Sequence, residues 1–193
     1  MMEYNLKKIH SENSFFIEGT HALIEALFQD DFPESGKTKA ELPDIWIFSR
    51  DGVDELYPFL RQIVSHRPTI IFGKECHKRL LNSVPGLEQM VFLNLKISPD
   101  RAGDRIKKAF IACRYGLPVN PVSFISYPAL TLFERNVLTV FMSGESISDF
   151  SFRTGKSVNA ISACKRRIMR KLYVFNNQEL FAKAWAMGIH FDA

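Results

Sequence analysis

Cysteine is scarce in this chain, and the three cysteines, Cys76, Cys113 and Cys164, stand far apart. The sequence has no C-x-x-C pair and no set of Cys and His at the spacing of zinc ligands, so it predicts neither a disulfide framework nor a metal site. Reduced thiols are expected. The five histidines are scattered and form no set with a nucleophile and an orienting acid. We therefore expect no enzyme activity, no catalytic residues and no cofactor.

Long apolar runs are also missing. No run approaches about 18 residues, the length that spans a bilayer, and the chain does not begin with a charged and then apolar leader. We expect neither a membrane span nor a signal peptide, and we expect the protein in the cytoplasm. Apolar residues still make up 46% of the 193 residues, which is enough to bury the cores of two small domains.

Net charge divides the chain into two parts. Residues 122–193 hold 9 Lys/Arg and 5 Asp/Glu and so carry all of the net charge of +4, whereas residues 1–121 hold 16 of each sign. The densest basic run, 165–171, has five bases in seven residues. Such a run attracts phosphates whatever their sequence context. Other structures would explain the same basic run: the solvent-exposed face of a helix, or a basic helix that binds a membrane surface or a protein partner.

Helix start signals surround this basic run. Three N-caps are expected, two of them with the acid of a capping box three residues later: Thr131 with Glu134, Ser146 with Asp149, and Ser157. Gly144 and Gly155 fall where short turns between helices need a residue that adopts positive φ. Ile161, Ile168 and Leu172 recur at helical spacing in the third helix. Three helices in about 45 residues with short turns predict a helix-turn-helix.

The segment from Leu130 to Val174 resembles, without a gap, the DNA-binding domain of LuxR-type bacterial transcription regulators. The family pattern is L-T-x-x-E-x-x-V-L, then Gly, S-x-x-[DE]-I-A, S-x-x-T-V-x-x-H and a basic stretch that ends in K-L. The residues in register with it are Leu130, Thr131, Glu134, Val137, Leu138, Gly144, Ser146, Asp149, Gly155, Ser157, Ile168, Lys171 and Leu172. Ala160 and Cys164 replace the family's Thr and His. The resemblance implies a regulator that binds double-stranded DNA as a homodimer, or as a heterodimer with another response regulator.

The same resemblance assigns DNA contacts within the third helix. Ser162, Ala163 and Arg166 match the positions that reach base edges, and Arg166 has the planar fork for a bidentate contact to guanine. Asn159 can reach an adenine edge or remain hydrated. The predicted phosphate contacts, which would fix the register on DNA, are Lys165, Arg167, Arg170 and Lys171.

Residues 1–114 alternate strand-like and helix-like segments, which predicts an α/β domain with a mainly parallel sheet. The expected strands are 45–48, 69–72 and 90–95, and the expected helices are 16–27, 53–64 and a third that starts after Ser98 with Pro99 at its first position. Residues 115–129, with three prolines, are expected to be a linker. Residues 130–193 are expected to form an all-α domain whose fourth helix covers 177–187.

The segment order of residues 1–114 is similar to that of a response-regulator receiver domain. In that register Ser11 and Glu12 stand at the acidic pair that holds Mg²⁺ in the family, and Ser49 stands at the position of the phosphorylated Asp. Gly73 takes the place of the usual Thr or Ser, and Lys96 lies near the position of the usual Lys. Phosphoryl transfer to Asp needs the carboxylate nucleophile and a metal held by acids. The resemblance therefore implies a degenerate receiver-like domain that works without phosphorylation.

Two other functions stay open at this point. The chain would be a phosphorylated response regulator if Asp51, two residues after Ser49, served as an unconventional acceptor. Alternatively, its helix-turn-helix would be a protein-binding module that captures a partner regulator and has no affinity for DNA.

Overall fold

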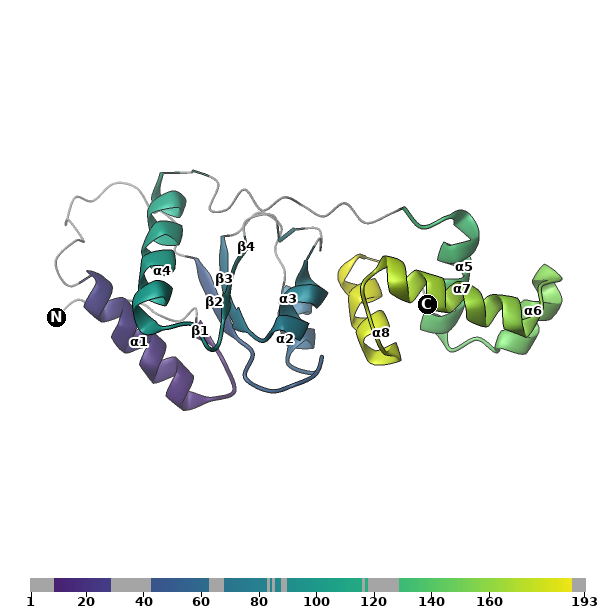
Figure 1. Cartoon of the computed structure of the whole chain (residues 1–193), viewed down its shortest axis with the longest axis horizontal. Helices are drawn as coiled ribbons and strands as arrows, with labels where there is room; N and C mark the ends of the chain where they lie inside the picture. Colours follow the sequence, from purple (N-terminus) through teal and green to yellow (C-terminus); the bar gives the residue numbers. More distant parts are fainter. Residues whose placement is uncertain are drawn as a thin grey trace. The chain divides into compact units, whose positions relative to one another are not determined.

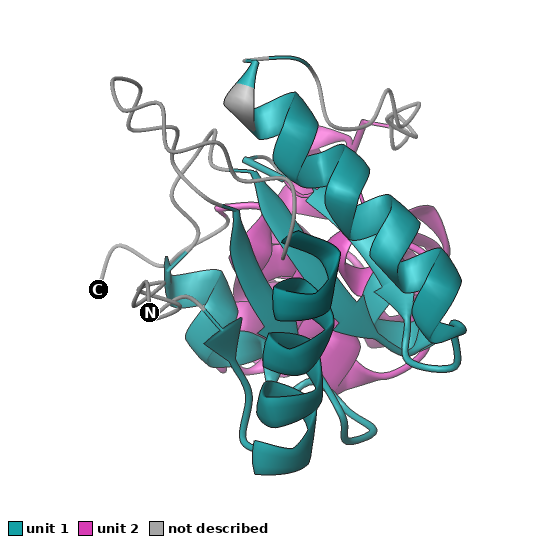
Figure 2. Ribbon diagram, turned by 90° about the vertical axis from the view of Figure 1, so that its left-hand side faces the viewer, with its two compact units in different colours: residues 1–78, 86–123 teal, residues 79–85, 124–193 magenta. Residues whose placement is uncertain are grey.

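The computed structural model describes residues 9–28, 43–62, 68–82, 84, 86–87, 90–115, 117 and 129–188. The chain divides into two compact units (Figure 2). The α/β unit consists of residues 1–78 and 86–123, and the helical unit consists of residues 79–85 and 124–193.

The α/β unit is built on a four-stranded sheet in which all neighbouring strands are parallel and follow one another in chain order (Figure 1). The strands are β1 (Ile9–His10), β2 (Asp44–Ile47), β3 (Thr69–Gly73) and β4 (Met90–Asn94). Because all four run in the same direction, their carboxyl ends lie along one edge of the sheet. Ligand sites of open α/β sheets form at this edge.

Helices cover both faces of the sheet (Figure 1). On one face lie α1 (Ser14–Phe28) and α4 (Pro99–Arg114), and on the other lie α2 (Leu56–Gln62) and α3 (Glu75–Leu81). A Cβ added at Gly103 of α4 would lie 3.0 Å from Cδ2 of Leu27, so glycine permits the close approach of α4 to α1.

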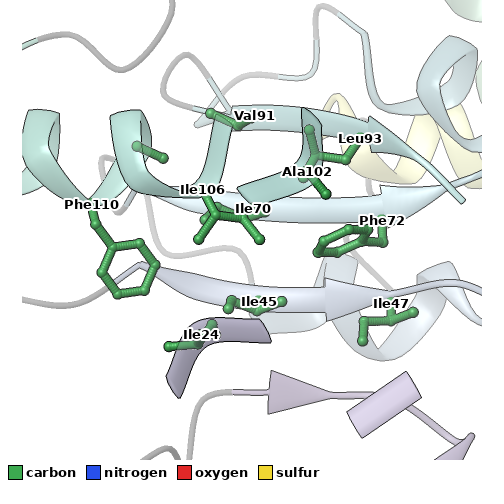
Figure 3. Close-up of a cluster of buried hydrophobic side chains, with 11 residues drawn as sticks. Ile24, Ile45, Ile47, Ile70, Phe72, Val91, Leu93, Ala102, Ile106 and Phe110 are labelled. Atoms are coloured by element: carbon green, nitrogen blue, oxygen red, sulfur yellow. The ribbon is translucent and has the colours of Figure 1, made fainter. Parts of the chain in front are cut away.

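The main core lies between the sheet and the α1–α4 layer (Figure 3). Alternate strand residues enter it, as the two-residue period of a strand requires. The core residues are Ile45, Ile47, Ile70, Phe72, Val91 and Leu93 from the strands and Ile24, Ala102, Ile106, Ala109 and Phe110 from the helices. The opposite face is also apolar, because the ring of Phe59 in α2 packs edge-on against Trp46 and Phe48, at centroid distances of 5.1 and 5.7 Å. Burial on both faces explains why these strands read as continuous apolar runs.

The described part of the helical unit contains four complete helices: α5 (Leu132–Ser143), α6 (Ile147–Thr154), α7 (Val158–Lys171) and α8 (Asn177–Ala186). The first three pack against one another. Cys164 is buried in α7 and Phe150 is buried in α6.

The predicted parallel α/β arrangement and the four C-terminal helices are confirmed over the described residues, with shifts at the ends of elements. The helix expected over 53–64 begins only at Leu56, and its expected last residues lie outside the described part of the chain. Helix α3 was not predicted; with seven residues it is too short for its periodicity to stand out. Of the expected linker, only residues 115, 117 and 129 are described, and the proposed domain boundaries stay predictions.

Candidate nucleic-acid interface

The start of α5 is fixed by the expected capping box. The hydroxyl of Thr131 accepts a hydrogen bond from the backbone N–H of Glu134 at 3.2 Å, and the Glu134 carboxylate accepts one from the backbone N–H of Thr131 at 2.8 Å. Each bond satisfies a donor that the first turn of a helix leaves without a partner. The helix therefore begins at a defined residue, and this fixes Glu134 on the inner side of the unit.

The two turns of the helix-turn-helix begin at the predicted glycines. Gly144 follows α5 with φ of 70° and Gly155 follows α6 with φ of 64°, both in the left-handed region that favours glycine. The capping box expected at the start of α6 is wrong. Ser146 occupies the N-cap with extended backbone, but its side chain makes no capping hydrogen bond. Asp149 lies in the first turn of α6, where its charge still complements the helix dipole.

Helix α7 begins at its predicted cap and carries one buried stripe. The hydroxyl of Ser157 accepts a hydrogen bond from the backbone N–H of Ala160 at 3.2 Å. Ile161, Cys164 and Ile168 are buried, and Leu172 continues the stripe directly after the helix. This stripe holds α7 against the rest of the unit, so the opposite side of the helix is left to solvent.

Three arginines occupy the solvent side of α7. Arg166, Arg167 and Arg170 are exposed, and among the described residues none of their guanidinium groups forms an ion pair or a hydrogen bond. Asn159 is seven residues before Arg166, which is close to two turns at 3.6 residues per turn, so it shares this face. Asn159 is exposed, whereas Ser162 and Ala163 are half-buried. The DNA contacts assigned to these six residues stay predictions.

Lys165, by contrast, is directed back onto α5. Its Nζ lies 4.0 Å from the centroid of the Phe141 ring, in a cation–π contact. Burial lowers the pKa of Lys165 below its ordinary value. The ammonium group that the sequence analysis assigned to a phosphate contact is thus partly engaged by the Phe141 ring of the same unit. Phe141 gave no signal in the sequence beyond its aromatic character.

The ammonium group of Lys171 also has partners within the helical unit. Its Nζ donates to Glu134 Oε2 at 2.7 Å and lies 3.4 Å from the backbone oxygen of Ala129. Glu134 is only 2% exposed. Burial acts to raise the pKa of Glu134, but the hydrogen bonds from Lys171 and from the Thr131 backbone outweigh it and lower that pKa. The carboxylate therefore stays charged beside the ammonium group, and the pair joins the start of α5 to the end of α7.

The residues of the expected degenerate pocket lie at the carboxyl edge of the sheet, and their assignment to a receiver pocket stays a prediction. Ser49 follows β2, and its hydroxyl donates to Glu55 Oε1 at 3.4 Å. Glu55 Oε2 also accepts the backbone N–H of Arg50 at 3.1 Å, while the Arg50 guanidinium pairs with Glu12 at 2.9 Å. Glu55 and Arg50, which the sequence did not single out, thus connect Ser49 with Glu12.

The other pocket positions take different partners. The Ser11 hydroxyl accepts the backbone N–H of Asn13 at 3.1 Å, and Gly73 ends β3 opposite Asn94. The backbone N–H of Lys96 donates to the Asn94 side chain at 2.9 Å. The structure therefore does not join Ser11, Gly73 and Lys96 into one cluster with Ser49 through any hydrogen bond among the described residues.

Asp51, the alternative acceptor, is exposed and paired with Lys74 at 2.9 Å. The hydrogen bond from Lys74 lowers the pKa of this carboxyl. Within the described ranges, no group of three or more His, Cys, Asp or Glu side chains is arranged to hold a metal ion. None of the described helices has the length and apolar character needed to cross a membrane.

No family model matches the chain, and no curated protein matches it. Solved structures that resemble it at low identity include two response regulators. One is the RcsB response regulator of Salmonella typhimurium, described for its conformational dynamism in DNA interaction, with 18% identity, a TM-score of 0.34 and coverage of 90% of this chain and 95% of RcsB. The other is full-length FixJ from B. japonicum, with 16% identity, a TM-score of 0.35 and coverage of 95% of this chain and 97% of FixJ. Both similarities are below the level that carries a residue role from one protein to another.

Proposed function

We propose that this chain is a DNA-binding transcription regulator of the LuxR type, in which α7 lies in the major groove of double-stranded DNA. The observation that carries the proposal is the solvent face of α7, where three guanidinium groups have no ion-pair partner among the described residues. Phosphate oxygens are the natural partners of such groups, and each phosphate that is neutralised releases counterions. In this proposal Lys165 and Lys171 are engaged by Phe141 and Glu134 within the helical unit and contribute little to DNA contact.

Base reading is assigned to the middle of the same face. Arg166 offers the planar pair of donors that matches the acceptors O6 and N7 of guanine, and Asn159 offers the amide that matches adenine. Arg167 and Arg170 flank this position and are assigned to the phosphates. Because one helix-turn-helix reads only a few base pairs, we infer that the protein acts as a homodimer or a heterodimer on paired half-sites.

The α/β unit acts in this proposal as a receiver-like domain that works without phosphorylation. Ser49 stands where a carboxylate nucleophile is needed, and its hydroxyl is hydrogen-bonded to Glu55. A serine hydroxyl at that place cannot form the acyl phosphate that an aspartate forms. In addition, Glu12, which would help to hold Mg²⁺, forms an ion pair with the Arg50 guanidinium at the surface.

The DNA interface is tested by measuring affinity for a random-sequence duplex over a series of salt concentrations. Arg167→Ala and Arg170→Ala should each weaken binding and lower the slope of log K against log salt by about 1. Arg101→Ala on α4 removes the same charge from an exposed position of the α/β unit and should leave the slope unchanged. Equal slopes for all three variants and the unaltered chain would remove α7 from the interface.

Phosphorylation is tested by incubating the full chain with acetyl phosphate and Mg²⁺. The intact mass and the affinity for DNA should both stay unchanged. An added phosphoryl group that maps to Asp51 would contradict the proposal and support the alternative of an unconventional acceptor.

A second candidate function is the protein-binding module. It is favoured by Phe152 in α6, which is 93% exposed although aromatic side chains are usually covered. A helical unit that binds no DNA at low salt, while a partner regulator covers Phe152, would establish this function in place of the first.

A further inference from the structure

One buried histidine at the carboxyl edge of the sheet has no role in the proposed function. His77, in the first turns of α3, is 0% exposed. Its Nδ1 lies 3.1 Å from the backbone nitrogen of Lys74, and its Nε2 lies 3.1 Å from the backbone oxygen of Gly52. A backbone N–H can only donate, so Nδ1 must be unprotonated and accept this bond. The proton is therefore on Nε2, which donates to Gly52, and the ring is neutral.

The ring joins two loops that are far apart in sequence. Gly52 belongs to the loop after β2 that carries Ser49 and Asp51, and Lys74 directly follows β3. The ring of Phe48 packs edge-on against His77 at a centroid distance of 5.4 Å. The Nε2 contact with Gly52 thus holds the β2–α2 loop against α3, and the bond from the Lys74 N–H, three residues earlier in the chain, fixes the orientation of the ring.

Gly73 gives independent support for a dedicated place for this ring. A Cβ at position 73 would lie 3.0 Å from Nδ1 of His77 and 3.1 Å from Cζ of Phe92. The ring of His77 therefore fills the space that a side chain at position 73 would need. Glycine at this position makes room for the ring.

We propose that His77 is a latch that closes the β2–α2 loop onto the start of α3, and that the latch opens when the ring takes up a second proton. That proton would have to go onto Nδ1, the atom that accepts the Lys74 N–H. Protonation would turn this acceptor into a donor that faces another donor, so the Lys74 bond that orients the ring toward Gly52 would be lost. It would also place a positive charge where there is no solvent, which is costly without a close counter-charge.

The charged groups around the ring do not remove this cost. From the β2–α2 loop, Asp51 and Glu55 favour the charged ring, and Lys74 opposes it. Asp51 is paired with Lys74, and Glu55 is engaged by Ser49 and by the Arg50 backbone. On α3 itself, Glu75 and Lys78 pair with each other at 3.7 Å. Burial is the largest influence and lowers the pKa of His77 below its ordinary value of 6.5, although the bond to Gly52 acts in the opposite direction.

The sign of the pH effect follows from this direction. Well above pH 6.5 the ring is neutral in the closed and the open loop, so the latch is unaffected by pH. Below that value the open form binds a proton more readily than the closed form, so the closed form loses stability as the pH falls. The loss continues until the pH reaches the lowered pKa of the closed form. Acidification would thus change the loop that carries Ser49, the position where a receiver is phosphorylated.

The latch adds to the proposed function, because it would make the regulator respond to acid. Only this link between acid and gene regulation rests on DNA binding; the latch itself does not. The latch itself is tested without DNA, by NMR on the isotope-labelled full chain between pH 7.5 and 5. The His77 ring should titrate below 6.5. Hydrogen exchange of the Lys74 amide, divided by its intrinsic rate, should rise at least tenfold as the ring titrates, while the amide of Ile70 in the central strand β3 stays protected.

Two variants separate the latch from a general effect of acid. His77→Gln does not titrate, so exchange at Lys74 should lose its pH dependence. Gly73→Ala should displace the ring and raise Lys74 exchange at neutral pH, whereas the control Gly19→Ala has no atom within 4 Å of its new Cβ and should change nothing. These two alanine variants and the titration decide the matter even if His77→Gln does not fold.

Three outcomes would overturn the latch: titration of His77 at or above 6.5, Lys74 exchange that does not follow this titration, or equal exchange in the two alanine variants. DNA affinity measured at the same pH values is a separate readout. A chain that binds no DNA at any pH would refute the proposed function and leave the titration of His77 as evidence for the latch.

Discussion

Substitution of Lys171 distinguishes a structural charge from a DNA contact. Lys171→Met keeps most of the side-chain volume but leaves the Glu134 carboxylate, 2% exposed, without its ammonium partner at 2.7 Å. Removing one member of a fully buried pair costs about 3–5 kcal/mol, and a hydrogen bond to a charged group contributes about 1.5–3 kcal/mol. The Lys171 side chain is 23% exposed and the backbone N–H of Thr131 still binds the carboxylate, so we expect a loss of about 2 kcal/mol.

The loss can be measured in the helical unit alone by following denaturant unfolding with NMR. The chain has two tryptophans, Trp46 in β2 and Trp185 in α8, so each unit has its own indole signal. The Trp185 transition should shift and the Trp46 transition should not. Glu134→Gln combined with Lys171→Met removes both charges and should recover at least half of the loss, because no buried carboxylate is then left without a partner.

The same pair predicts the response to acid. Because the pKa of Glu134 is lowered in the folded chain, its contribution is complete above the unfolded value and disappears as the pH falls through the folded value. Lys171→Met should therefore make the helical unit less sensitive to acid in this range. Unchanged stability of Lys171→Met, together with a fall in the salt slope of DNA binding by about 1, would refute our assignment and return Lys171 to the phosphates.

Two further predictions concern the caps and the base contact. Ser157→Ala should destabilise the helical unit by about 1 kcal/mol in the same unfolding assay, whereas Ser146→Ala should cost only a few tenths, because only Ser157 makes a capping hydrogen bond; equal losses would contradict this reading. Arg166→Ala should cost about 1–3 kcal/mol on a site selected from a random DNA library and relax preference at one base in each half-site, while Arg166→Lys should keep much of the affinity for random DNA. Equal losses on selected and random DNA, measured at one salt concentration, would make Arg166 a phosphate contact.

The elements that the sequence predicted well are those in which local chemistry and packing agree. The capping box of Thr131, the cap of Ser157 and the left-handed turns at Gly144 and Gly155 all depend on residues within a few positions of one another. The buried stripe of α7 follows from helical period alone. Helix α3 was missed because it spans only two turns and its most buried polar residue, His77, is held by contacts to a loop 25 residues earlier.

The carboxyl edge of the sheet shows the same limit. The similarity to a receiver assigned Ser49 and Glu12 to one pocket, which stays a prediction, but their observed connection depends on Glu55 and Arg50, which lie in a loop without a periodic pattern. A pairing between side chains of different loops is set by the fold and not by spacing along the chain. Sequence alone therefore placed residues of this edge without predicting which of them would meet.

The basic run of α7 shows why a charge count does not give an interface. Five bases in seven residues cannot all lie on one side of a helix that turns once every 3.6 residues. Those nearest the buried stripe must find partners inside, and Lys165 and Lys171 find the Phe141 ring and the Glu134 carboxylate. The three arginines remain on the outer face. The number of phosphate contacts made by α7 should therefore follow the three arginines and not the five bases, and this is what the salt slope of DNA binding measures.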